Sequence, residues 1–110
     1  MPEVRVVVYI DATGRSAFTR WFEELNSEAA AKVTTALYRM RQGNFSNVEG
    51  VGGGVFEYRI DFGPGYRIYF GKDGETLVVL LGGSAKKRQQ HAIQAAQQSW
   101  MEYRHRKAHG

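Results

Sequence analysis

Three short strand-like runs, joined by two strong turn signals, constrain the fold of this chain more than any other feature. The runs are Val55 to Phe62, Tyr66 to Gly71 and Thr76 to Leu81, and all are rich in β-branched or aromatic residues. Gly63-Pro64-Gly65 and Lys72-Asp73-Gly74-Glu75 separate them. Because both separators are typical of tight turns, the sequence predicts a three-stranded antiparallel meander.

Helical periodicity flanks this predicted meander. Residues 15–25 and 28–41 form two amphipathic segments with a short connection, which predicts a helical hairpin with Ser27 as the N-cap of its second helix. A last helix is expected after Gly82-Gly83, and it can cover one face of the sheet. The apolar positions of the three helices are Phe18, Trp21, Phe22, Leu25, Val33, Leu37, Met40, Ile93, Ala96, Trp100 and Tyr103.

The remaining segments complete the expected order of elements. Val4 to Ile10 predicts a first strand, Phe45 to Gly54 predicts a loop, and the tail after Arg104 is expected to fray. The order is β-α-α-β-β-β-α. We therefore expect an α+β fold, with an antiparallel sheet, an N-terminal helical hairpin and a C-terminal helix.

Length and composition narrow the class of protein. The 110 residues predict one domain over 1–110, and the absence of cysteine excludes disulfides, thiolate metal sites and a cysteine nucleophile. The longest apolar runs are too short to span a bilayer, and Met1-Pro2-Glu3 is unlike a secretory leader. We expect a cytoplasmic protein with no membrane partner, no cofactor and no metal. His105 and His109 are four residues apart, but they lack a third ligand.

Charge is distributed unevenly along the chain. Residues 1–85 carry 9 basic and 10 acidic side chains, whereas residues 86–110 carry 6 basic side chains and only Glu102. Lys86, Lys87 and Arg88 stand at the expected start of the last helix, where the helix dipole favours anions rather than cations. A bound polyanion would explain this cluster, and so would a solvated helix face that tolerates a weak penalty.

The period of a strand sorts the meander side chains into two faces. Glu57 and Arg59 share one face of their strand, and Arg67 and Tyr69 share the matching face of the next strand. We expect these side chains to converge on the open face of the sheet, with Lys86 nearby. The alternative is structural: Glu57 and Arg59 can pair with each other, and Tyr69 can be an ordinary cross-strand aromatic residue.

Such a surface suits cleavage of an RNA backbone without a metal. The reaction needs the 2′-OH deprotonated, the phosphate charge stabilised and the leaving 5′-oxygen protonated. Arg59 and Arg67 suit the charge-stabilising role, because guanidinium binds phosphate oxygens but is a poor base. The residues that remain as candidates to move protons, stack a base or bind the substrate are Lys86, Glu57, Tyr66, Tyr69, Lys87 and Arg88.

Several segments together resemble the RelE/ParE toxin superfamily, and specifically its HigB-like "addiction module killer protein" branch. The resemblance rests on Gly54–Phe70, on Leu80-Leu81-Gly82-Gly83, and on Lys86 with Gln89 and Ile93. Arg39–Asn44 and the Phe18, Trp21, Leu25 pattern also fit, so roughly residues 15–103 are covered. The resemblance implies a small toxin domain of the fold expected above.

The same resemblance implies a function and its partners. Members are typically ribosome-dependent mRNA endoribonucleases of type II toxin–antitoxin systems, which inhibit translation and are neutralised by a cognate antitoxin, often of the helix-turn-helix type. Arg59 looks like the phosphate-binding arginine, Arg67 like the second strand cation and Lys86 like the lysine of the usual Gly-Gly-Asp-Lys segment. Ala85 and Ala92 depart from the pattern, since the family usually has Asp there. Two alternatives remain: a ParE-type inhibitor of DNA gyrase, and a non-catalytic module that binds RNA or an antitoxin.

Overall fold

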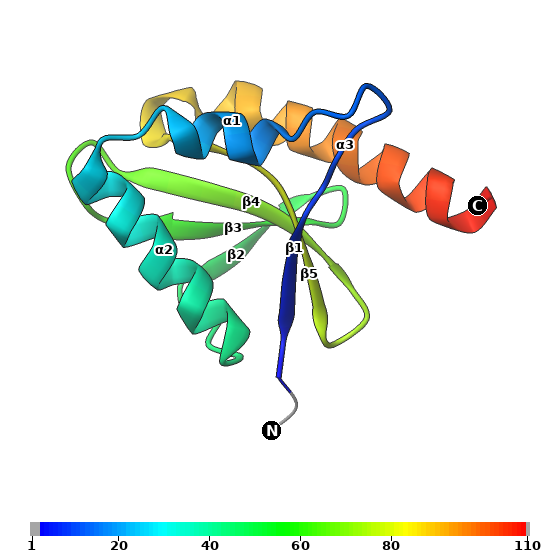
Figure 1. Cartoon of the computed structure of the whole chain (residues 1–110), viewed down its shortest axis with the longest axis horizontal. Helices are drawn as coiled ribbons and strands as arrows, with labels where there is room; N and C mark the ends of the chain where they lie inside the picture. Colours follow the sequence, from blue (N-terminus) through cyan, green and yellow to red (C-terminus); the bar gives the residue numbers. More distant parts are fainter. Residues whose placement is uncertain (1–2, 110) are drawn as a thin grey trace.

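A five-stranded sheet with helices on both of its faces forms the body of the molecule (Figure 1). The computed structural model describes residues 3–109. Its elements are β1 (Arg5–Val8), α1 (Ala17–Glu23), α2 (Ser27–Arg41), β2 (Val48–Gly52), β3 (Val55–Ile60), β4 (Tyr66–Asp73), β5 (Leu77–Ala85), the 3₁₀ turn η1 (Lys86–Arg88) and α3 (Gln89–His109). The strand order is β1-β5-β4-β3-β2, so β5 and β4 lie centrally and β1 and β2 form the edges.

The predicted meander is confirmed, because β3 pairs antiparallel with β4, and β4 pairs antiparallel with β5. The expected end of the last strand before Gly82-Gly83 is wrong, since β5 continues to Ala85. Gly82 and Gly83 pair with β4 inside the strand, and they do not end it. A β-carbon on Gly83 would lie only 2.2 Å from the ring of Trp21, so the bare backbone makes room for that ring.

Both edges of the sheet differ from the sequence prediction. β1 pairs with β5 in parallel, so the sheet is mixed rather than wholly antiparallel. β2 lies within the segment predicted to be a loop, and it raises the number of strands from four to five. The sequence of β2 shows no alternation of apolar and polar residues, because this strand is held by backbone pairing with β3. The pairing shifts register between Gly50 and Gly52.

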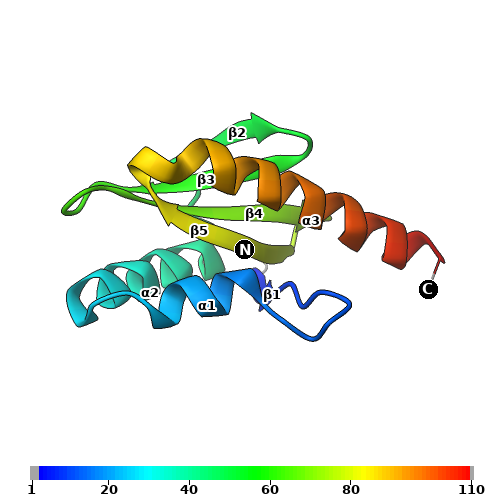
Figure 2. The same cartoon turned by 90° about the horizontal axis from the view of Figure 1, so that it is seen from above.

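The hairpin of α1 and α2 covers one face of the sheet, as Figure 2 shows. Ser16 caps α1 by accepting a hydrogen bond from the amide of Thr19. The cap of α2 is Asn26, which accepts from the amide of Ala29, so the prediction of Ser27 is wrong by one residue. The most deeply buried residues between this hairpin and the sheet are Val33, Met40, Ile68 and Phe70.

Helix α3 covers the opposite face and runs beyond the sheet (Figure 2). Ala96 and Trp100 bury against Val55, Tyr69 and Val79, which confirms the apolar face predicted for this helix. The prediction of a frayed tail is wrong, because the helix continues to His109. Its last turns are anchored: Arg106 donates a hydrogen bond of 2.7 Å to the carbonyl of Ile10, and Lys107 pairs with Asp73.

No helix in the described part of the chain combines the length and the apolar character needed to cross a membrane.

Candidate functional site

Two rows of polar side chains cross the central strands on the face that α3 covers. In one row, Arg59 of β3 lies opposite Arg67 of β4, and Arg67 lies opposite Ser84 of β5. In the neighbouring row, Glu57 lies opposite Tyr69. The structure therefore brings together four of the residues singled out from the sequence, and it does so through the period and register on which that prediction was based.

The expectation of an open face is wrong for three of these residues. Glu57 is 7% exposed, Arg67 is 6% exposed and Tyr69 is fully buried. Tyr69 belongs to the same apolar cluster as Trp100 of α3. The helical hairpin takes one face of the sheet and α3 takes the other, so these three side chains are covered, whereas the side chain of Arg59 remains exposed.

Arg67 and Glu57 form a buried pair. The Nε of Arg67 lies 3.8 Å from Oε2 of Glu57, and its Nη1 donates a hydrogen bond of 3.2 Å to the carbonyl of Tyr66. Within residues 3–109, the Nε atom has no hydrogen-bond partner. Buried donors are normally satisfied, so this guanidinium retains capacity for one more acceptor.

The turn between β3 and β4 brings Lys86 close to Arg67. Gly65 has a φ of +82°, and a β-carbon there would lie 3.3 Å from Cβ of Lys86 and 3.9 Å from Nη1 of Arg67. The amide of Lys86 donates a hydrogen bond of 2.9 Å to the carbonyl of Gly65. Glycine thus allows the turn to lie close to both the stem of Lys86 and the guanidinium of Arg67.

Arg59 is the accessible arginine of the row. Its Nη1 lies 3.1 Å from Oε2 of Glu49 on the edge strand β2, and its side chain is 45% exposed. The matching pair, Arg67 and Glu57, is buried one strand further into the sheet. Because an exposed ion pair is worth little, Arg59 can exchange Glu49 for another anion at small cost.

Tyr69 and Ser84 close the inner end of the cluster. Their hydroxyl oxygens lie 3.0 Å apart, and both side chains are buried. Burial raises the pKa of Tyr69, and its hydrogen bond with Ser84 partly offsets this effect. The phenol is therefore held neutral in the folded protein, with its hydroxyl occupied by Ser84.

Three further predicted site residues have different positions. Tyr66 lies on the face of the helical hairpin, where its ring centroid is 6.4 Å from that of Trp21. Lys87 and Arg88 are exposed in the turn η1. Arg88 lines a hollow of about 400 Å³ at the start of α3, together with Trp21 and Glu24. The structure therefore does not bring Tyr66 to the polar rows, and it keeps Lys87 and Arg88 on the surface.

The start of the last helix is rich in cations and has no side-chain cap. Ala85 occupies the cap position of η1, and it offers no side-chain acceptor to the amides that follow. Cationic side chains at a helix start favour an anion, although the amide of Lys86 already donates to the carbonyl of Gly65. These exposed cations lie at the same end of the sheet as Arg59 and Arg67, whose charges Glu49 and Glu57 partly balance.

Metal-binding residues do not gather in the described part of the chain: no three His, Cys, Asp or Glu side chains form a group that could hold an ion. His105 and His109 stack one turn apart on α3, with ring centroids 4.4 Å apart.

Sequence reasoning missed two residues of the cluster, Glu49 and Ser84. Glu49 falls in the segment predicted to be a loop, so nothing in the sequence marked it as the partner of Arg59. Ser84 follows Gly82-Gly83, where the strand was predicted to have ended. Alternation along a longer β5 would place Ser84 on the face opposite Tyr69, because Val79 and Leu81 share the cluster of Tyr69. The register shift between β4 and β5 turns Ser84 to the face of Tyr69, and nothing in the sequence marks that shift.

Comparison with known proteins gives a relative from Haemophilus influenzae. No family model matches the chain, and no solved structure matches it. An uncharacterized protein of Haemophilus influenzae is 40% identical over 80 residues, which cover 72% of this chain and 81% of the relative. At that identity and coverage, the chain belongs to the same protein family as the Haemophilus influenzae protein.

Proposed function

We propose that this protein is the toxin of a type II toxin–antitoxin system, and that it cleaves mRNA on the ribosome. One observation carries the proposal: cations from β3, β4 and the turn η1 lie at the same end of the sheet, with Lys86 and Arg67 both close to Gly65. Separate segments contribute charge to one place, as recognition of a phosphodiester requires. The resemblance to the HigB-like branch, with an mRNA substrate and a cytoplasmic setting, supports the same function.

The proposed chemistry needs no metal. The 2′-oxygen of the ribose attacks the adjacent phosphorus, the bond from phosphorus to the 5′-oxygen breaks, and the products are a 2′,3′-cyclic phosphate and a 5′-hydroxyl. One group takes the proton from the 2′-OH and another returns a proton to the 5′-oxygen. Arg59 and Lys86, both exposed, would contact the phosphate, while Arg67 adds positive charge from behind them.

The proposed partners follow from the same surface. An mRNA held on the ribosome would approach Arg59 and Lys86, with Lys87 and Arg88 beside them. A cognate antitoxin, of the helix-turn-helix type by resemblance, would block this approach by covering the cations. Charge complementarity of that kind makes association strongly dependent on salt.

The test uses two exposed cations, because their removal leaves the fold intact. Production of the wild-type protein in bacterial cells should stop growth and generate new 5′-hydroxyl ends in mRNA. The double variant Arg59→Ala with Lys86→Ala should do neither. The matched control is Arg20→Ala with Arg104→Ala, which removes the same charge from exposed positions of α1 and α3. Transcripts cut equally by the Arg59 and Lys86 variant, or not cut by the wild type, would reject the proposal.

A second candidate function is a module that binds RNA without cleaving it. The observation that favours it is the burial of Arg67 and Glu57 as a pair, which keeps both groups away from a bound phosphate. Ala85 and Ala92, which stand where the resembled family usually has Asp, also favour binding without cleavage. Purified protein that binds RNA or ribosomes, yet leaves transcripts intact, would support this function over cleavage.

A further inference from the structure

The outer edge of β1 is free to pair with another strand. In the described chain β1 pairs only with β5, and the amides of Arg5 and Tyr9 donate to carbonyls on the β5 side. Because successive residues of a strand in a parallel ladder alternate in direction, the amides and carbonyls of Val6 and Val8 point away from the sheet. This edge is bounded by Val4, whose amide binds the carbonyl of Arg41, and by Ile10, whose carbonyl binds Arg106.

The two edges of the sheet differ in how they are protected. β2 contains Gly50 and Gly52, and its ladder shifts register between them, which twists an edge and blocks regular pairing. β1 consists of Arg5 followed by three valines, and its ladder with β5 is regular. Of the two, only β1 presents a straight template for an added strand.

Apolar side chains and a hollow accompany the free edge. Val8 is 37% exposed, Ile10 is 51% exposed and Met101 of α3 is 63% exposed. A hollow of about 480 Å³ lies between β1 and the last turns of α3, lined by Val7, Val8, Tyr9, Ile10, Val79, Tyr103, Arg106 and Lys107. In recognition by strand addition, main-chain bonds give affinity, and hollows of this kind accept alternate side chains.

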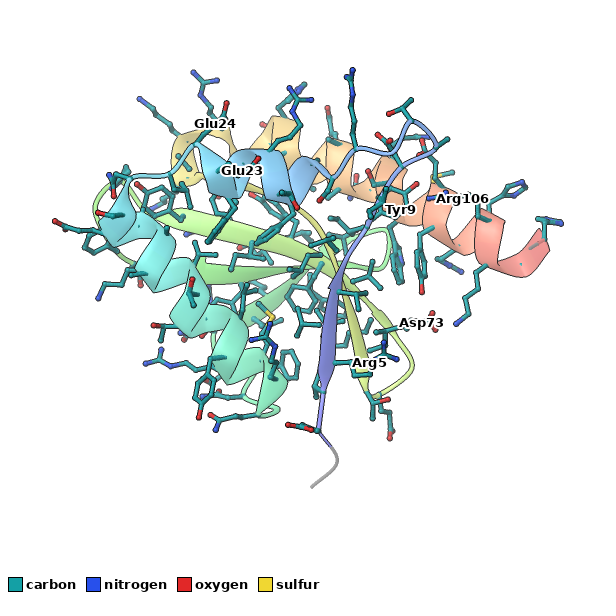
Figure 3. The ribbon with its side chains drawn as sticks, viewed as in Figure 1. Arg5, Tyr9, Glu23, Glu24, Asp73 and Arg106 are labelled. Carbon is teal, nitrogen blue, oxygen red and sulfur yellow. The ribbon has the colours of Figure 1, made fainter. Side chains whose placement is uncertain are left out.

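Charge decides which kind of strand fits. Arg5 stands at one end of β1, and Arg106 lies at the other end beside Tyr9, as Figure 3 shows. The guanidinium carbon of Arg106 is 5.1 Å from the centroid of the Tyr9 ring. Glu102 accepts a hydrogen bond from the hydroxyl of Tyr9 and balances part of the charge of Arg106, whereas Arg5 has no ion-pair partner within residues 3–109. A second copy of this chain would bring its own Arg5 against these cations, so self-pairing is opposed. An acidic segment is attracted.

We propose that the free edge of β1 binds an extended, acidic segment of a partner protein, which adds a strand to the sheet. Apolar side chains of the segment would alternate into the hollow beneath α3, and its carboxylates would meet Arg5 and Arg106. This surface shares no residue with the cluster of Arg59, Arg67 and Lys86. The inference therefore stands or fails independently of RNA cleavage.

The experiment uses a synthetic peptide of about eight residues in which valine and glutamate alternate. Its controls are the same peptide with lysine in place of glutamate and a peptide of the same composition with the valines grouped. In the ¹⁵N-labelled full chain, the amides of Val6 and Val8 should exchange quickly with solvent. Addition of the acidic peptide should slow their exchange and shift the resonances of residues 6–10. The two control peptides should produce neither change.

Two variants separate main-chain pairing from side-chain contact. Val8→Pro removes an amide that the β1–β5 ladder does not use, and we expect it to weaken binding by at least about tenfold. Val8→Ala keeps that amide, so it should weaken binding less. Arg106→Glu should reverse the preference between the acidic and the basic peptide. If Val8→Pro does not fold, Arg106→Glu still tests the proposal.

Three results would overturn the proposal. One is a dimer whose interface protects Val6 and Val8 in the absence of peptide, since a second copy would then occupy the edge. Another is peptide binding that leaves the exchange of these two amides unchanged. The third is equal binding of the acidic and the basic peptide by the wild-type chain.

Discussion

At the scale of single residues, two adjacent glycines test how closely the sheet is packed. A β-carbon on Gly83 would overlap the ring of Trp21, whereas one on Gly82 would meet nothing within 4 Å. Neither glycine has a positive φ, so backbone strain is the same for both. We expect Gly83→Ala to lower the free energy of unfolding by about 1–3 kcal/mol, and Gly82→Ala to change it by less than about 0.5 kcal/mol. Urea denaturation of the two variants measures the difference, and equal stability would show that Trp21 moves aside freely.

The two arginine–glutamate pairs offer a second comparison between residues. Arg67→Ala leaves the carboxylate of Glu57 buried without its partner, and we expect a loss of about 3–5 kcal/mol in the free energy of unfolding. Arg59→Ala removes an exposed partner of Glu49, and we expect a loss below about 1 kcal/mol. Denaturation curves of both variants decide the matter. Similar small losses would mean that Arg67 is not held as a buried charge.

At the scale of elements, the last turns of α3 depend on Asp73 at the end of β4. The ammonium of Lys107 and the hydroxyl of Tyr103, which donates a hydrogen bond of 2.6 Å, lower the pKa of Asp73. Because the pKa is depressed in the folded state, this stabilisation is present above the ordinary value of 3.8 and is lost as the pH falls through the depressed value. Helicity of α3, followed by amide exchange of residues 103–109, should decrease in acid. Asp73→Asn should remove this dependence, while Glu75→Gln, on the exposed turn, should retain it.

The same contact predicts an effect in alkali. The hydrogen bond to the carboxylate of Asp73 raises the pKa of Tyr103 to about 12, from the ordinary value of 10.0. A raised pKa means that this stabilisation is complete below pH 10.0 and is lost as the pH rises through about 12. Ultraviolet titration of the phenolates should therefore show a late component that Asp73→Asn shifts to lower pH. Its absence would show that Tyr103 does not donate to Asp73.

The elements that sequence predicted correctly are those with a strong period. The helices at α1 and α2 and the strands β3 and β4 have apolar residues at regular spacing, because each buries one side against the core. β2 has no such spacing, since its backbone pairs while its side chains remain largely exposed. The end of α3 was missed for a related reason: it is held by Lys107 and Arg106, whose partners Asp73 and Ile10 are distant in the sequence.

At the scale of the whole molecule, four residues of the candidate site were predicted to lie together, but their exposure was not predicted correctly. Period and register were sufficient to place Glu57, Arg59, Arg67 and Tyr69 on one face. Whether that face meets solvent depends on where α3 packs, and no local pattern encodes the packing of a distant helix. Exposure separates Arg59 from Arg67, so it decides which arginine can first contact a polyanion.

The uneven charge of the molecule gives a last prediction. Lys86, Lys87 and Arg88 are all exposed, and they lie at the start of α3. If they contact the phosphates of a single-stranded RNA, each contact adds about 0.7 to the slope of log affinity against log salt. Replacing all three with alanine should make the slope shallower by about 2.

Arg15, Arg20 and Arg41, which are also exposed, provide the control: their triple alanine variant has the same net charge, and it should keep the wild-type slope. A labelled polyuridylate titrated at several salt concentrations measures both slopes, and equal losses in the two variants would mean that net charge, rather than this end of the sheet, attracts RNA.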